Sequence, residues 1–213
     1  MKKFLLLISS VLLAFGANAQ VSKFEGASAT VALAYQSYSI DATSVVLANG
    51  RSLTAPNSAS KGAVGKVGLD YTWSLGNENL LAVGLDYALN GGGYGLIDYQ
   101  YQGASVATEG VKSKQKVKIF IAPSTLINQD TLGYIKLGYA QYQAKFRSNG
   151  SKVTRSAITY GIGAKFMASE KSYFFAEANM LSGRSKTSVS ADGTTSNTKP
   201  KGSEILVGYG VKF

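Results

Sequence analysis

Hydrophobic and polar residues alternate along much of the chain with a period of two, and the last ten residues show this most clearly. Ile205, Val207, Tyr209, Val211 and Phe213 occupy one parity. The other parity carries a glutamate, a leucine, two glycines and a lysine. Because successive side chains of a strand point to opposite faces, this segment predicts a strand with one apolar face that runs to the end of the chain.

Seven earlier segments have the same alternation, and no segment has convincing helical periodicity. They are residues 29–36, 63–73, 81–87, 116–122, 135–140, 158–166 and 174–180. Together with the terminal segment they predict an all-β chain of about eight strands.

The connections between these strands alternate in length. Residues 41–60, 91–110 and 183–201 are long and rich in Gly, Ser, Thr and Asn, whereas residues 76–79, 124–130 and 168–171 are short. The connection near residues 148–150 belongs to the long series but is brief. Such alternation is typical of a transmembrane barrel with periplasmic turns and external loops, and an even strand number places both termini on the periplasmic side. Because residues 94–101 and 106–116 also alternate, residues 91–116 are open to two interpretations, a loop or an extended hairpin above the membrane.

The direction in which the apolar face points distinguishes a membrane barrel, where it faces outward, from a soluble sandwich, where it is buried. The face opposite the apolar stripe is crowded with glycines, which weaken a strand on a solvated face but leave room for long side chains inside a narrow barrel. Aromatic residues end the apolar stripes, as in the two aromatic girdles of a membrane barrel; the alternative is that they are ordinary core residues. We therefore predict an eight-stranded antiparallel up-and-down transmembrane β-barrel, with girdle residues Tyr35, Trp73, Tyr87, Tyr139, Phe166 and Phe213.

Charged residues on the inward parity predict a polar network that fills the lumen. Buried charges must be paired, so we expect carboxylates to pair with Lys and Arg of neighbouring strands, above all Lys165 with Glu177 across a tight turn. The network is interpreted as a polar plug, with an ion gate as the alternative. Its members are Lys66, Asp70, Asp86, Lys136, Arg155, Lys165, Glu177 and Glu204.

The N-terminus has the pattern of an export signal. Lys2 and Lys3 precede an apolar run over residues 4–15 and a small-x-small site at residues 17–19. The run is shorter than the ~20 residues of a membrane helix, which argues against the alternative of an uncleaved anchor. We predict a signal peptide over residues 1–19 and one barrel domain over residues 20–213. Without Lys2 and Lys3 the chain has 20 basic and 12 acidic residues, a net charge of +8.

The composition argues against most site chemistry. The chain has neither Cys nor His, which removes disulfides, thiolate sites and Ser-His triads. We expect no catalytic residue, no cofactor, no metal and no nucleic-acid partner. Four lysines at alternate positions, Lys112, Lys114, Lys116 and Lys118, are expected to share one face, either balancing inward carboxylates or forming a basic rim for lipopolysaccharide phosphates.

Taken together, the signal peptide, the eight alternating stripes, the girdles and the terminal aromatic residue resemble the small outer-membrane β-barrel family, the porin-like OmpA/OmpX type. The resemblance covers residues 20–213 and implies export by the general secretory route, a Gram-negative outer-membrane location and contact with lipid and lipopolysaccharide. It also implies that Tyr209, Val211 and Phe213 form the signal read by the barrel-assembly machinery, with periplasmic chaperones as partners during biogenesis and a monomer as the product.

Three functions remain open on the sequence. The first is an interaction barrel that contributes to envelope structure and presents its loops. The second is a narrow porin for small solutes or a path for apolar molecules, and the third is a lipid-acting enzyme, against which the missing His argues.

Overall fold

The chain folds into a closed antiparallel β-barrel of eight long strands. The computed structural model describes residues 23–47, 49–55, 59–76, 78–92, 94–147, 150, 152–189 and 195–213, so the signal peptide expected over residues 1–19 lies outside the described part. In that part, no helix has the length and apolarity needed to cross a membrane. The barrel strands are β1 (Gly26–Val46), β3 (Ala59–Gly76), β4 (Asn79–Ala88), β6 (Ala104–Asn128), β7 (Thr131–Phe146), β8 (Lys152–Ser169), β9 (Ser172–Gly183) and β11 (Thr195–Lys212).

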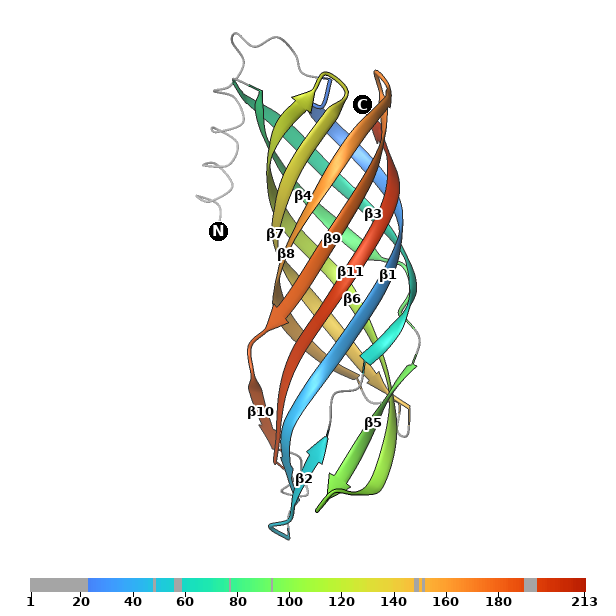
Figure 1. Cartoon of the computed structure of the whole chain (residues 1–213), viewed down its shortest axis with the longest axis vertical. Helices are drawn as coiled ribbons and strands as arrows, with labels where there is room; N and C mark the ends of the chain where they lie inside the picture. Colours follow the sequence, from blue (N-terminus) through green and yellow to red (C-terminus); the bar gives the residue numbers. More distant parts are fainter. Residues whose placement is uncertain are drawn as a thin grey trace, which may run out of the picture.

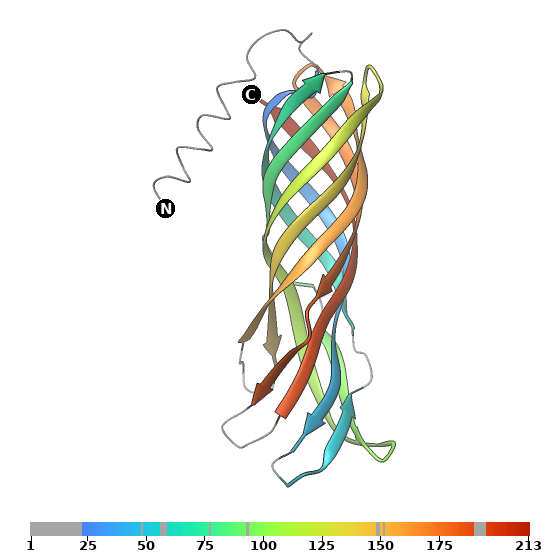
Figure 2. The same cartoon turned by 90° about the vertical axis from the view of Figure 1, so that its left-hand side faces the viewer.

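Each strand pairs with its neighbour along the chain, and the last strand pairs with the first. The order is β1-β3-β4-β6-β7-β8-β9-β11, and β11 returns to β1 in a register that runs from Ser28↔Lys212 to Val46↔Thr195. The strands tilt around a common axis, and both described ends of the chain lie at the same end of the barrel (Figures 1 and 2). The predicted fold class is confirmed, and closure leaves no free edge along the middle of the barrel.

The apolar face points outward. The side chains of Leu69, Leu137 and Ile162 are 54%, 45% and 66% exposed, whereas Lys66 and Glu177 are each 3% exposed. A soluble sandwich would show the reverse. The barrel therefore has the inside-out pattern of a membrane protein, with an apolar outer belt and a polar interior.

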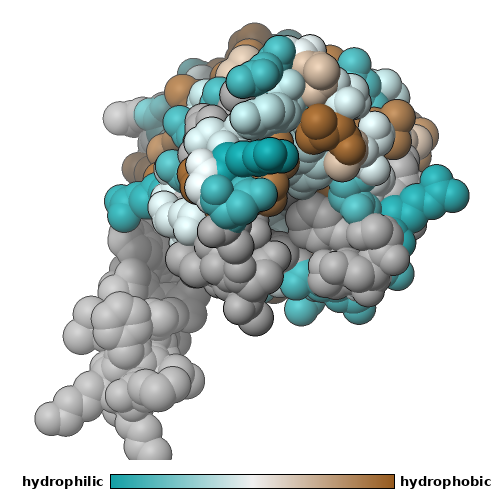
Figure 3. Space-filling view, turned by 90° about the horizontal axis from the view of Figure 1, so that it is seen from below, coloured by the Kyte–Doolittle hydropathy of each residue, from teal (hydrophilic) through white to brown (hydrophobic). Residues whose placement is uncertain are grey.

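Three short strands extend the barrel wall at the end opposite the termini. They are β2 (Ser52–Ala55), β5 (Tyr94–Tyr101) and β10 (Lys186–Val189), and we call this end the crown (Figure 1). Strand β2 pairs with β1, β5 with β6 and β10 with β11, and one residue pair, Thr54↔Gln100, joins β2 to β5. Seen from this end, the crown presents mostly hydrophilic and neutral side chains (Figure 3).

Two expectations about the connections change. Residues 41–60, 91–110 and 183–201 were expected to be loops, but they contain the ends of β1, β3, β6 and β11 besides the three crown strands; of the two interpretations of residues 91–116, the hairpin is correct. Its turn at Gln102 and Gly103 has positive φ at both residues (51° and 83°), as a type I′ turn requires. The short connection expected at residues 124–130 is also wrong in extent, because β6 continues to Asn128.

In the described part, the places near the crown where the wall loses a strand pairing include the following two. Between the end of β4 and the start of β5, the ladders of β6 stop at Val117 and resume at Lys112. Between β8 and β9, pairing ends at Ala157↔Gly183, while β8 continues outward to Lys152 beside β7. We call these places the β4–β5 break and the β8–β9 break.

Candidate functional site: the charged lumen

The centre of the lumen holds an ion-pair cluster from four strands. Lys136 of β7 donates to both carboxylate oxygens of Glu177 of β9, at 2.6 and 2.7 Å. Its Nζ also lies 3.4 Å from Asp86 of β4, and Asp86 pairs with Lys118 of β6 at 2.7 Å. Lys136 stands 3.9 Å from the centre of the Phe120 ring, which adds a cation–π contact in a water-poor site.

Two further ion pairs lie on either side of this cluster along the barrel. Towards the termini, Lys165 of β8 reaches across the lumen to Asp70 of β3 at 3.3 Å and lies over the Tyr173 ring. Towards the crown, Lys66 of β3 pairs with Glu204 of β11. Glu204 also accepts hydrogen bonds from the Tyr38 hydroxyl at 3.1 Å and from the Asn179 amide at 3.3 Å.

The charges that take part in these ion pairs balance. Four lysines and four carboxylates take part in these pairs: Lys66, Lys118, Lys136 and Lys165 with Asp70, Asp86, Glu177 and Glu204. Because each buried ion has a partner of opposite sign, the interior avoids the large cost of an isolated charge in a medium of low dielectric constant.

Inward aromatic rings fill the space between the ion pairs, and the inward glycines make room for them. A Cβ atom on Gly163 would lie 2.5 Å from the Tyr134 ring, and one on Gly208 would lie 2.5 Å from the Phe175 ring. Sequence reasoning missed these rings, because they share the parity of the charges and were overlooked beside the outward aromatics. Inward glycine opposite an inward ring is the signal that could have identified them.

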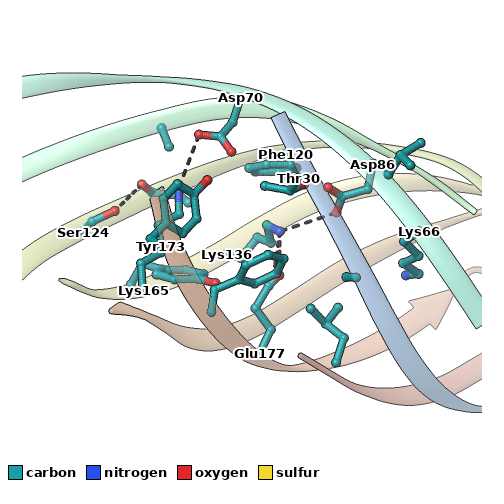
Figure 4. A pocket seen from close by; sticks show the side chains of 17 residues that line it. Thr30, Lys66, Asp70, Asp86, Phe120, Ser124, Lys136, Lys165, Tyr173 and Glu177 are labelled. Carbon is teal, nitrogen blue, oxygen red and sulfur yellow. Dashed lines mark hydrogen bonds and ion pairs between the residues drawn. The ribbon is translucent and has the colours of Figure 1, made fainter. Parts of the chain in front are cut away.

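A small cavity lies between the ion pairs of the lumen. The cavity has a volume of about 30 Å³ and is lined by Asp70, Asp86, Lys136, Lys165 and Glu177 among others (Figure 4). A cavity of this size with polar walls is large enough to hold bound water.

The structure changes two expectations about individual charges. The pair expected between Lys165 and Glu177 is not formed, because β8 and β9 place Glu177 opposite Gly163 and each charge has a partner elsewhere. Lys116 and Lys118 do not share a face either, since a register shift lies between Gln115 and Val117. Lys116 is exposed and Lys118 is buried, as expected when a bulge inverts the alternation. The basic rim of four lysines was therefore wrong as a single face; the side chain of Lys114 lies outside the described part.

The remaining predicted residues lie outside the central ion-pair cluster. Arg155 is half-buried at the level of Tyr142, near the crown, and its guanidinium donates to the Thr154 carbonyl at 3.2 Å.

Among the predicted girdle residues, Trp73 is half-buried, with its ring 4.7 Å from that of Tyr71. The other predicted girdle residues face outward, and the terminal ring of Phe213 is 81% exposed: Tyr35, Tyr87, Tyr139, Phe166 and Phe213. Outward aromatics absent from the predicted girdles include Tyr71, Tyr160 and Phe174. Residues Tyr209 and Val211 of the expected assembly signal also face outward.

The described residues include no group of three or more acidic side chains that could hold a metal ion. No family model matches the chain, and no curated protein sequence matches it.

Solved structures resemble it in fold. The outer membrane protease OmpT of Escherichia coli is 11% identical, with a TM-score of 0.53 and 92% of this chain and 99% of that one covered. The outer membrane protein OprG of Pseudomonas aeruginosa is 12% identical, with a TM-score of 0.50 and 91% and 99% covered. The attachment invasion locus protein Ail of Yersinia pestis is 16% identical, with a TM-score of 0.48 and 89% and 100% covered.

At these identities the likeness shows the fold and not the activity, and the presence of a protease among the neighbours means that the fold by itself does not exclude catalysis. The chain thus has the fold of the outer-membrane β-barrels, consistent with the small OmpA/OmpX-like type.

Proposed function

We propose that this protein is an integral outer-membrane barrel with a closed lumen, which contributes to envelope structure and presents its crown at the cell surface. The observation that carries the proposal is the filled interior, where four lysines and four carboxylates pair around a cavity of about 30 Å³. We propose no catalytic role for these residues.

The energetics of the ion pairs favour a plug over a gate. To open a path, Lys136 must leave Glu177 or the aromatic rings must change rotamer in a packed interior. Removing one partner of a buried ion pair typically costs about 3–5 kcal/mol, so an open state reached by separating such a pair is rare unless water or a new partner compensates. The same groups satisfy the polar interior without any transport role.

Conductance of the purified protein in planar lipid bilayers tests this function. A plugged barrel is expected to give no steady single-channel current. Reproducible steps would instead support the alternative, a narrow channel for small solutes. The matched variant is Lys136→Met/Glu177→Leu, which removes two paired charges while keeping apolar volume; it should remain silent if packing and not charge closes the lumen.

Biogenesis follows from the same proposal. We infer export by the general secretory route, contact with periplasmic chaperones and the barrel-assembly machinery, and insertion as a monomer with the crown outside. The outward residues Tyr209, Val211 and Phe213 near the end of β11 support an assembly signal. Phe213→Ser is expected to lower the amount of heat-modifiable protein in outer-membrane fractions; an unchanged amount would contradict the signal.

A further inference from the structure

The β8–β9 break leaves an open groove in the barrel wall. Beyond Ala157↔Gly183, residues 152–156 of β8 pair with β7 alone among the described strands, and β10 pairs with β11. Figure 1 shows β10 continuing below β9, at the crown end. The groove beside the unpaired part of β8 has a volume of about 580 Å³. This volume is within the range of small-molecule sites.

The lining of this groove is basic and rich in hydroxyl groups. Arg155 enters it from β8 and Arg184 from the segment after β9, and the remaining polar side chains are Thr154, Ser156, Ser182 and Ser185. None of the described residues that line the groove is a carboxylate. An unpaired strand edge also offers backbone N–H groups. Two guanidinium groups beside hydroxyls and an open edge are suited to an anion with several oxygen atoms, because arginine binds phosphate through two parallel hydrogen bonds.

The groove is polar at one end and apolar at the other. Tyr139 and Ile158, which face each other across β7 and β8, are 50% and 57% exposed and line its end nearer the middle of the barrel. Towards the crown, Arg155 has the inward parity of Ala157 and reaches the groove from the lumen side. Arg184 has the outward parity of Ser182, the partner of Ile158, and reaches the groove from the outer side. An occupant with a charged head and an apolar body fits this gradient better than a soluble anion.

We propose that the β8–β9 groove binds the phosphorylated sugar headgroup of an outer-leaflet lipid. Arg155 and Arg184 hold the phosphate monoester, the serine and threonine hydroxyls bond to the sugar, and Tyr139 and Ile158 contact the first part of the acyl chains. The inference rests on the proposed outer-membrane location with the crown outside, but not on whether the lumen conducts.

The test is a titration of the full-length exported chain in detergent micelles, with bound lipid counted by native mass spectrometry. The probes are bis-phosphorylated lipid A, the same lipid with both phosphates removed, and inorganic phosphate as a competitor. We expect the phosphorylated lipid to bind at least about tenfold more tightly than the dephosphorylated one, since each charge-assisted contact contributes about a factor of ten. Arg155→Gln/Arg184→Gln should remove this preference.

The control variant is Lys61→Gln/Lys116→Gln, which removes the same charge from exposed positions on β3 and β6 outside the groove lining. It should bind as the unmodified protein does, and all proteins must show the gel shift on heating that indicates a closed barrel. Equal losses in the two double variants would contradict a specific site, as would equal binding of the two lipids. Displacement of the lipid by inorganic phosphate at comparable concentration would contradict a lipid occupant. A conductance measurement tests the closed lumen and not the lipid site in the groove. The closed-lumen proposal and the lipid-site proposal can therefore be contradicted independently.

Discussion

The two breaks near the crown arise from the same event, a strand that leaves its neighbour, but their chemistry differs. At the β4–β5 break, side chains take the place of the missing strand: the Ser113 amide donates to the Ser60 hydroxyl at 3.3 Å, and the Gln36 amide donates to the Ser113 carbonyl at 3.2 Å. At the same break, the side-chain oxygen of Asn90 accepts a hydrogen bond from the Gly65 amide at 2.7 Å. At the β8–β9 break the structure shows an open groove with arginines and hydroxyls.

The comparison shows what closes a barrel wall. A stretch without a partner strand has unsatisfied backbone groups, and inside a membrane protein these must be paired. Buried Gln and Ser side chains are short neutral donors and acceptors that can do so within the wall. At the open break the groove is lined by Arg155 and Arg184, whose charged side chains we propose to bind an anion. We therefore interpret the closed break as part of the barrel structure and, under the proposal above, the open break as a recognition site.

The central ion pair, which lies deeper than either break, should give the largest effect. Glu177→Leu leaves Lys136 with only its longer contact to Asp86, and we expect the free energy of unfolding to fall by about 3–5 kcal/mol. Urea unfolding in lipid vesicles measures this loss. Lys136→Met/Glu177→Leu should recover most of it. A double variant as unstable as the single one would show that lost packing, and not the unpaired charge of Lys136, causes the destabilisation.

The next largest effect should come from opening the closed break. Gln36→Ala/Ser60→Ala leaves the buried amide and carbonyl of Ser113 without these partners, at a cost of about 1–3 kcal/mol for each group. Urea unfolding gives the stability change. Ser156→Ala/Ser182→Ala, the matched pair at the open break, should change stability by less than about 0.5 kcal/mol. Similar losses in the two pairs would remove the distinction between the breaks.

A smaller effect is expected where β9 ends at the open break. Gly183 packs against the Pro200 ring, and an added Cβ would collide with it. Gly183→Ala should therefore cost about 1–3 kcal/mol through overpacking, as measured by urea unfolding. Ser182→Ala next to it is the control, and an unaffected Gly183→Ala would mean that the segment moves freely.

The alternation of side chains revealed the eight strands and their inward charges, because a barrel wall with one apolar and one polar face requires period two. It indicated the β5–β6 hairpin only as one of two interpretations, and it could not reveal β2 and β10, which are four residues long each. It could not reveal the partners of Lys165 and Glu177 either. In a closed barrel a long side chain reaches across the lumen, as Lys165 does to Asp70, and adjacency along the sheet does not decide the pairing.

The smallest effect concerns pH and the β5–β6 hairpin of the crown. Hydrogen bonds from Ser105 and then Gln100 to the carboxylate of Asp98 lower its pKa below the ordinary 3.8. A carboxyl with a lowered folded pKa stabilises the fold above the unfolded pKa, and this contribution is lost as the pH falls through the folded value. Amide hydrogen exchange should show the hairpin opening more often below pH ~4. Asp98→Asn should remove that dependence, whereas an unchanged pH profile would contradict it.

The most direct test of the inside-out barrel is fluorescence quenching by lipids brominated in their acyl chains. Trp73 is the chain's single tryptophan, so a Trp73→Phe background allows one reporter at a time, at Leu69, Leu137 or Ile162. We predict strong quenching at all three sites, because their side chains face hydrocarbon. Reporters that acyl-chain bromine leaves unquenched, but that a water-soluble quencher reaches, would contradict the account.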